Sequence, residues 1–285
     1  MVVSRGNKIL VVIIAVIFVA IIGGYAYIQS ESGLDSPLSV IMSRSMQHDN
    51  DHSSLGVIDT GDVMVIEQYS KAKSEGRVQS YVEGTQTGFK TFGDYGSVII
   101  YERSNDSNPV IHRAIVWLDY NGNGTWSAPS LKDYHGQWSC YKNGSYITNP
   151  DALCGTLTFI DVTQSRKTVS INLDNLDKTS GYLTMGDNPE SNRYFDQLSL
   201  SQVTAPIGAD RIRSVAIMEI PWMGVIKVFM TPEKKDNLKY VPNSTYCLVM
   251  LFITVFALIY CCDLFYTRKE IQRRKKELDG LGENV

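Results

Sequence analysis

A serine and a histidine of this chain have side chains and surroundings that would allow them to act together in catalysis. Ser45 follows a short β-branched run, and His112 lies in an apolar run that is typical of a strand. A serine hydroxyl attacks a carbonyl at neutral pH only when a neighbouring base removes its proton, and histidine most often does so. These residue types predict acyl transfer through a serine nucleophile.

The order of five short motifs is more informative than any residue alone, since a strand histidine is usually a packing residue and Gly-Asp-Asn usually forms a turn. The motifs are Ser-x-Ser-Met at 43–46, Gly-Asp-Val-Met-Val at 61–65, Ile-His-Arg at 111–113, Leu-Thr-x-Gly-Asp-Asn at 183–188 and Ile-Pro-x-x-Gly-x-Ile-Lys at 220–227. In this order they resemble the boxes of type I signal peptidase. The histidine that precedes Arg113 makes the chain similar to the archaeal and endoplasmic-reticulum branch of that family.

The resemblance implies a membrane-bound serine endopeptidase that removes signal peptides from exported proteins. Ser45 would be the nucleophile, and His112 would be the general base that later protonates the leaving amine. The main-chain N–H of Ser45 and the hydroxyl of Ser43 would stabilise the oxyanion. Neither a metal nor a cofactor enters this chemistry.

The carboxylate that orients the base is where the chain departs from the family's pattern. In the pattern Gly-Asp-Asn-x-x-x-Asp, the second aspartate corresponds to Asn192 here. Asp196 follows a little later, and a lengthened turn would bring it to His112. We therefore expect Asp196 to orient the base, with Asp187 as the alternative. Arg113 and Asp187 are expected to form an ion pair near the base.

The expected substrates are preproteins that carry a signal peptide and are cleaved after small side chains. An extended segment would add to a strand of the outer domain and present alternate side chains to shallow pockets. Val40 and Met46 are expected to line those pockets. The lipid bilayer and the protein-export translocon are the other expected partners. Nucleic acid is not, because the chain carries a net charge of −3.

Two apolar runs predict membrane-spanning helices at the ends of the chain. Residues 9–28 contain no charged side chain and are long enough to cross a hydrocarbon core of about 30 Å. Residues 246–266 are interrupted only by Asp263. Lys and Arg precede the first run and follow the second, which predicts a two-pass protein of the cell membrane with both termini cytoplasmic and the part between outside. A cleaved signal peptide is the alternative for the first run.

Short β-branched runs separated by Gly, Asn, Asp and Pro predict a mainly β ectodomain. A polar excursion or short helix is expected at 71–84, and strands are expected at 39–42, 62–67, 97–102, 110–118, 155–162, 168–173, 181–185 and 225–229. The expected organisation is a signal-peptidase-like fold flanked by transmembrane helices. It comprises a cytoplasmic N-terminus (1–8), a catalytic β domain (29–116 and 178–245), an inserted β subdomain (117–177) and a basic cytoplasmic tail (267–285).

The cysteines and the remaining histidines suggest further features. Cys140 and Cys154 are expected to form a disulfide outside the membrane, which would close a loop in the inserted subdomain. Residues 48–52 contain two histidines and two aspartates, and a solvated loop is more common for such a sequence than a metal site. Two other functions stay open. One is a two-pass membrane protein with a non-catalytic β binding domain, and the other is a signal peptidase homologue without activity.

Overall fold

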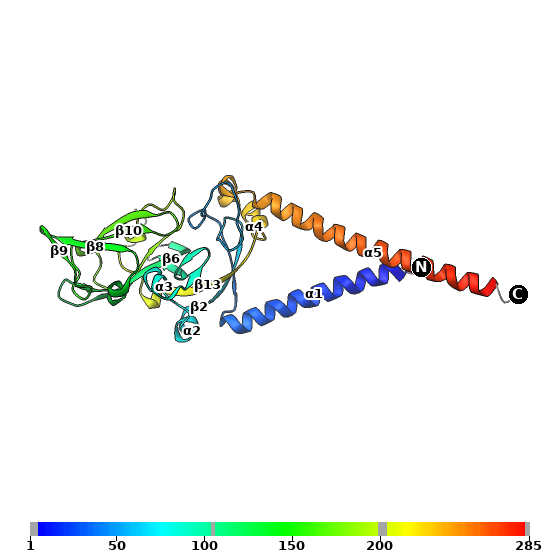
Figure 1. The fold of residues 1–285 in the computed structure, drawn as a ribbon, viewed down its shortest axis with the longest axis horizontal. Coiled ribbons are helices and arrows are strands. Elements are labelled where there is room, and N and C mark those ends of the chain that lie inside the picture. The colour runs from blue at the N-terminus through cyan, green and yellow to red at the C-terminus, as the bar shows by residue number, and fades with distance from the viewer. Residues whose placement is uncertain (1–4, 104–105, 199–203, 283–285) are drawn as a thin grey trace. The chain divides into compact units, whose positions relative to one another are not determined.

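The chain consists of two units in the computed structural model, which describes residues 5–103, 106–198 and 204–282. One unit comprises the long terminal helices, α1 (Arg5–Ser32) and α5 (Ser244–Gly282). The other is the central unit, residues 31–245, which is built mainly from strands (Figure 1). The expectation of a mainly β domain between two terminal apolar helices is therefore confirmed.

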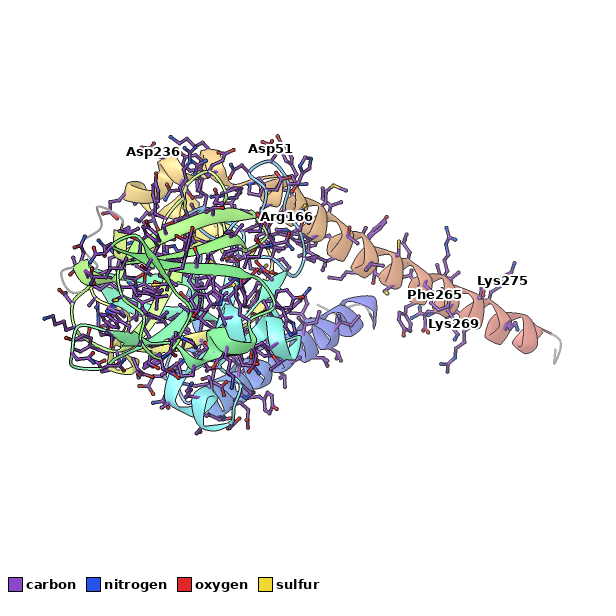
Figure 2. The ribbon with its side chains drawn as sticks, turned by 60° about the vertical axis from the view of Figure 1, so that its left-hand side comes forward. Asp51, Arg166, Asp236, Phe265, Lys269 and Lys275 are labelled. Atoms are coloured by element: carbon purple, nitrogen blue, oxygen red, sulfur yellow. The ribbon has the colours of Figure 1, made fainter. Side chains whose placement is uncertain are left out.

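Both terminal helices contain a segment that is long and apolar enough to span a membrane. The segments are Val11–Ser32 and Ser244–Lys276, and almost none of their residues are buried. The spans expected at 9–28 and 246–266 lie in these helices, which agrees weakly with a two-pass membrane protein. In α5, the basic side chains of Lys269 and Lys275 follow the apolar stretch (Figure 2). The orientation of the chain across a membrane stays a prediction.

A seven-stranded antiparallel sheet forms the centre of the second unit. Its strand order is β1-β2-β13-β5-β6-β12, and β7 pairs with β6. The strands are β1 (Leu38–Val40), β2 (Val63–Gln68), β5 (Val98–Arg103), β6 (Asp106–Tyr120), β7 (Trp126–Ser127), β12 (Gly181–Met185) and β13 (Ile212–Ile220). On β6, His112 is paired with Ile99 and Arg113 with Met185. Because successive side chains of a strand point to opposite faces, these two neighbours leave β6 on opposite sides.

A second sheet, with the order β11-β10-β8-β9, is formed by residues of the expected insertion. Its strands are β8 (Gln137–Lys142), β9 (Ser145–Ile147), β10 (Thr156–Val162) and β11 (Lys167–Asn172), while β3 (Lys90–Thr91) and β4 (Asp94–Tyr95) form a separate hairpin. Leu157 and Phe159 of β10 belong to the same hydrophobic cluster as Ile115 of β6 and Leu183 of β12. The second sheet therefore shares its core with the main sheet.

Short helices connect the strands. They are α2 (Tyr69–Ser74), α3 (Tyr81–Thr87) and α4 (Val225–Met230), with 3-10 turns η1 (Pro129–Asp133), η2 (Leu173–Asn175), η3 (Asp196–Leu198), η4 (Ala209–Arg211) and η5 (Pro232–Tyr240). A capping box begins α3: the Ser80 side chain accepts from the N–H of Glu83, whose carboxylate accepts from the N–H of Ser80. The helix expected at 71–84 is thus present as two short helices, α2 and α3.

The strand predicted at 225–229 is wrong, because these residues form helix α4. Val225 and Val228 are buried, whereas Ile226 and Phe229 are exposed. A spacing of three between buried positions is that of a helix face and not of a strand. The β-branched composition misled the prediction. Strands β8, β9 and β13 are not among the predicted strands, and β13 carries register shifts that obscure its alternation.

The disulfide expected between Cys140 and Cys154 is also wrong, because both cysteines are free thiols. Cys140 is fully buried on β8. Its Sγ donates a hydrogen bond to the main-chain carbonyl of Cys154 at 3.0 Å. The thiol is therefore directed at the backbone of Cys154 and not at its sulfur.

Candidate active site

The imidazole of His112 is held on one side by the carboxylate of Asp196. Nδ1 of His112 lies 2.7 Å from Oδ2 of Asp196, and both residues are buried. The same oxygen accepts hydrogen bonds from the hydroxyls of Tyr101 at 2.7 Å and Thr184 at 2.6 Å. Tyr101, His112 and Thr184 come from the adjacent strands β5, β6 and β12. The main sheet therefore places three donors around one carboxylate at the start of η3.

These contacts define the tautomer of the ring. Burial and the neighbouring charge of Asp196 raise the pKa of Tyr101 well above its usual value, so this hydroxyl remains a donor. Because a carboxylate oxygen only accepts hydrogen bonds, Nδ1 of His112 is the ring nitrogen that donates to Asp196. In the neutral ring, Nε2 then carries the lone pair that a general base requires. The side-chain amide of Asn192 lies 3.5 Å from Nε2 and can donate to it.

Ser45 lies in a turn that is fastened to the Gly-Asp-Asn motif. Its carbonyl oxygen accepts a hydrogen bond from the N–H of Asn188 at 3.0 Å. Gly186 permits this close approach, since a Cβ at this position would lie 2.4 Å from the Ser45 carbonyl oxygen and 2.6 Å from Nδ2 of Asn192. Any larger residue would displace one of these two groups. The motif therefore brings the backbone of Ser45 and the amide of Asn192 together.

The reactive groups of Ser45 are close to Ser43 and are not bonded to His112. The hydroxyls of Ser45 and Ser43 are 3.4 Å apart. Among the described residues, the N–H of Ser45 has no hydrogen-bond acceptor, and no hydrogen bond joins its hydroxyl to His112. The amide of Asn192 contacts the ring nitrogen that a serine hydroxyl would have to reach. The hydroxyl of Ser45 and the imidazole of His112 are therefore not joined by a hydrogen bond in this arrangement.

The second candidate aspartate, Asp187, is paired with Arg113. Nε of Arg113 donates to Oδ1 of Asp187 at 2.9 Å, and both side chains are almost completely buried. Burial alone raises the pKa of Asp187, but the guanidinium of Arg113 and the hydrogen bond from His48 outweigh it and lower the pKa to about 2. The carboxylate is therefore ionised at neutral pH.

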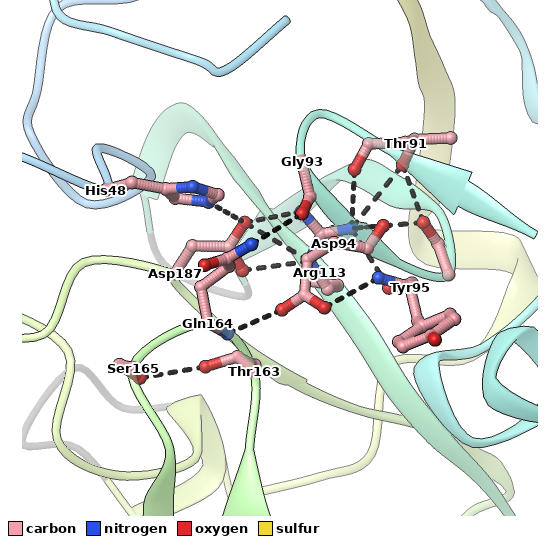
Figure 3. A network of polar contacts seen from close by, with 11 residues as sticks. His48, Thr91, Gly93, Asp94, Tyr95, Arg113, Thr163, Gln164, Ser165 and Asp187 are labelled. Atoms are coloured by element: carbon pink, nitrogen blue, oxygen red, sulfur yellow. Dashed lines mark hydrogen bonds and ion pairs between the residues drawn. The ribbon is translucent and has the colours of Figure 1, made fainter. Parts of the chain in front are cut away.

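The other end of Arg113 organises the loop around β3 and β4 (Figure 3). Its Nη1 donates to the carbonyls of Thr91 at 3.0 Å, Tyr95 at 3.0 Å and Gly96 at 3.1 Å. On the far side of Asp187, Nε2 of His48 lies 3.4 Å from Oδ2. The Arg113–Asp187 pair thus joins the loop after Ser45 to the hairpin β3–β4. Its contacts are those of a structural ion pair.

No family model, curated protein or solved structure matches this chain. The motifs and the geometry of the site are therefore the features that bear on its function. Among the described residues, no group of three His, Cys, Asp or Glu side chains is arranged to hold a metal ion. In the 48–52 segment, His48 contacts Asp187, while His52 is exposed and pairs with Asp49.

The two residues expected to line substrate pockets lie in different environments. Met46 is 1 % exposed and packs in a cluster with Ile41, Met64 and Val98. It anchors the turn of Ser45 to the core. Val40 is half-buried at the end of β1, next to Gly224. Their contact with a substrate stays a prediction.

Several residues that build the site were not identified as site residues from the sequence. Tyr101 and Thr184 complete the shell of Asp196, while Asn188 and Asn192 connect the serine turn to the base. Thr184 and Asn188 belong to the Leu-Thr-x-Gly-Asp-Asn motif at 183–188, so this motif could have identified them as site residues. Tyr101 carried no such signal, because a tyrosine in an apolar strand usually belongs to the core.

Proposed function

We propose that the protein is a membrane-anchored serine endopeptidase that cleaves N-terminal signal peptides from exported preproteins, similar to the archaeal and endoplasmic-reticulum type I signal peptidases. The observation that carries the proposal is the 2.7 Å contact between Nδ1 of His112 and Asp196. In the neutral imidazole, this contact leaves Nε2 with its lone pair on the side of the ring that Asn192 contacts. Asn192 also adjoins the turn of Ser45, so the nucleophile and the base share one neighbour.

The proposed reaction begins with the hydroxyl of Ser45. Its oxygen forms a bond to the carbonyl carbon of the scissile peptide while Nε2 of His112 takes the hydroxyl proton. When the carbon–nitrogen bond breaks, the same nitrogen returns that proton to the leaving amine. A water molecule, deprotonated by His112, then hydrolyses the ester and regenerates Ser45. Asp196 holds Nδ1 of His112 by a hydrogen bond and stabilises the imidazolium.

The oxyanion would be stabilised by groups of the serine turn. The N–H of Ser45 has no acceptor among the described residues, and the hydroxyl of Ser43 lies 3.4 Å from that of Ser45. Both donors are therefore near the atom that attacks. In characterised proteases, one such donor contributes about 3–4 kcal/mol to transition-state stabilisation.

The amide of Asn192 must move for this reaction to occur. It contacts Nε2 at 3.5 Å, which is long for a hydrogen bond and therefore weak. Catalytic hydrogen bonds of this kind often form only when substrate is bound. We propose that substrate binding replaces the Asn192 contact with the hydroxyl of Ser45.

The anchors would contribute by restricting where the enzyme acts. Val11–Ser32 ends six positions before the start of β1 and thirteen positions before Ser45. In the proposed topology, both termini are cytoplasmic and the central unit lies outside the cell membrane, where signal peptides emerge from the translocon. Holding the nucleophile near the bilayer would convert a search in solution into a local encounter.

The test is cleavage of a signal-peptide-bearing precursor by the purified full chain in detergent or lipid vesicles. Ser45→Ala and His112→Ala are expected to abolish cleavage while circular dichroism shows a folded protein. Ser54→Ala and His52→Ala are the matched controls, because both side chains are exposed. A fluorophosphonate probe should label the wild type at Ser45 and leave Ser45→Ala unlabelled.

The same experiment addresses the two rival functions. The amide of Asn192 contacts Nε2 of His112, and no hydrogen bond joins Ser45 to His112. Both observations are also expected for a signal peptidase homologue without activity. Wild-type protein that neither cleaves the precursor nor reacts with the probe would favour that alternative or a non-catalytic binding domain. Cleavage that persists in Ser45→Ala would contradict the proposed nucleophile.

A further inference from the structure

Lys167, the first residue of β11, fastens the turn that follows the Gly-Asp-Asn motif. Its ammonium donates to three main-chain carbonyls: that of Asn192 at 2.8 Å, that of Asn188 at 3.3 Å and that of Pro189. An ammonium group has three N–H donors, so these contacts use all of them. Residues outside the catalytic motifs therefore hold this turn through a charged group.

Two of these carbonyls belong to residues that contact the proposed nucleophile and base. The N–H of Asn188 donates to the carbonyl of Ser45 at 3.0 Å. The side chain of Asn192 contacts Nε2 of His112. Lys167 is thus linked to Ser45 through its contact with Asn188, and to His112 through its contact with Asn192. A shift of its ammonium would move both.

The second sheet also contacts the far end of the same turn. Phe159 of β10 packs edge-to-face on Phe195, with ring centroids 6.1 Å apart. Phe195 is fully buried and directly precedes Asp196. The second sheet therefore holds the segment that runs from Asn188 to Asp196 at both ends.

We propose that Lys167 is a positioning residue of the active site and that the inserted strands serve to hold the 188–196 turn against Ser45 and His112. The inference rests on the proposed function, which it extends from the serine and histidine to the insertion. Lys167 does not contact the reacting atoms in this arrangement. It acts through Asn188 and Asn192.

The test compares Lys167→Met and Lys167→Arg with the control Lys142→Met, all in the full chain. Lys142 lies on the same sheet and pairs with Asp174 at 2.9 Å, away from the turn. Two quantities are measured: kcat and KM for a signal-peptide substrate, and the ring ¹⁵N signals of His112 by NMR. The second measurement does not depend on cleavage.

Lys167→Met is expected to lower kcat about 10- to 100-fold with little change in KM, because displacing a reacting group by about 1 Å can cost about 100-fold in rate. Its His112 ring signals should shift from those of the wild type. Lys167→Arg keeps a cation with N–H donors and should recover most of kcat. Because a guanidinium does not deprotonate, this recovery would also show that Lys167 does not act as a general base. Lys142→Met should match the wild type.

The proposal is overturned if Lys167→Met and Lys142→Met have the same kcat and the same His112 signals. It is also overturned if Lys167→Arg is as slow as Lys167→Met. A wild type that does not cleave refutes the proposed function, while the NMR comparison still decides whether Lys167 positions His112. Should Lys167→Met not fold, Lys167→Gln retains amide donors and is expected to show the same shift to a smaller extent.

Discussion

The carboxylate of Asp196 contacts the imidazole of His112, although eighty-four positions separate them in the chain. Asp187, the other candidate, is engaged by Arg113 on a different side of β6. The two aspartates therefore have different surroundings and different expected roles. Asp196 contacts the imidazole of His112, whereas Asp187 neutralises the buried guanidinium of Arg113.

Asp196→Asn is expected to reduce kcat about 10³- to 10⁴-fold, because an amide can donate to Nδ1 of His112 and favour the wrong tautomer. An amide nitrogen in place of Oδ2 also removes the acceptor of the Tyr101 and Thr184 hydroxyls, so the thermal unfolding midpoint should fall as well. Precursor cleavage and circular dichroism check both points. Asp210→Asn, at an exposed aspartate, is the control. Full activity in Asp196→Asn would remove Asp196 from the proposed mechanism.

Asp187→Asn should act mainly on stability. It leaves the charge of Arg113 buried without its partner, which typically costs about 3–5 kcal/mol in the free energy of unfolding. The pKa of Asp187 is about 2, below the value of about 3.9 expected in an unfolded chain. Its contribution to stability is therefore present above about pH 4 and is lost as the pH falls toward 2. Urea unfolding at several pH values measures this loss, which Asp187→Asn should not show.

Asp59 and Glu219 predict a pH dependence of the opposite sign. Burial raises the pKa of Asp59 to about 6 and that of Glu219 to about 7, and each carries an oxygen without a hydrogen-bond partner. Asp62 lies close to both and adds to the effect. The folded state holds these protons more tightly than the unfolded state, so stability should decrease as the pH rises from about 4 to about 7.

The double variant Asp59→Asn/Glu219→Gln checks this second pH dependence. Neutral amides replace the two buried acids, so the free energy of unfolding should decrease less than that of the wild type between pH 5 and 8. It should also exceed that of the wild type at pH 8. A wild type that gains stability over this range would show that the two carboxyls are not protonated in the folded state.

Gly186→Ala tests the contact between the motif and the serine turn. The added methyl would lie 2.4 Å from the carbonyl oxygen of Ser45 and must displace it or Asn192. Overpacking of this kind costs about 1–3 kcal/mol, and cleavage should fall well beyond what that loss of stability explains. Gly23→Ala, with no atom near the added methyl, is the control. Unchanged cleavage would mean that the turn tolerates a different position of Ser45.

Much of the fold followed from local pattern. The apolar runs specified the terminal helices, and β-branched runs specified the central strands such as β6 and β12. The prediction failed where composition and periodicity disagreed, as in α4, whose β-branched residues follow a helical spacing. It also failed for Cys140, since a sequence separation that allows a disulfide does not determine where a thiol points.

The sequence alone determined the residue types for serine chemistry, their order along the chain and the two apolar terminal segments. Only the tertiary structure decided which carboxylate meets His112, that Asn192 contacts its imidazole, and that Lys167 binds the carbonyls of Asn188 and Asn192. The physical reason is that each of these contacts joins strands or turns far apart in sequence. Their distances are set by sheet pairing and by the shared core, and neither can be read from local residue patterns.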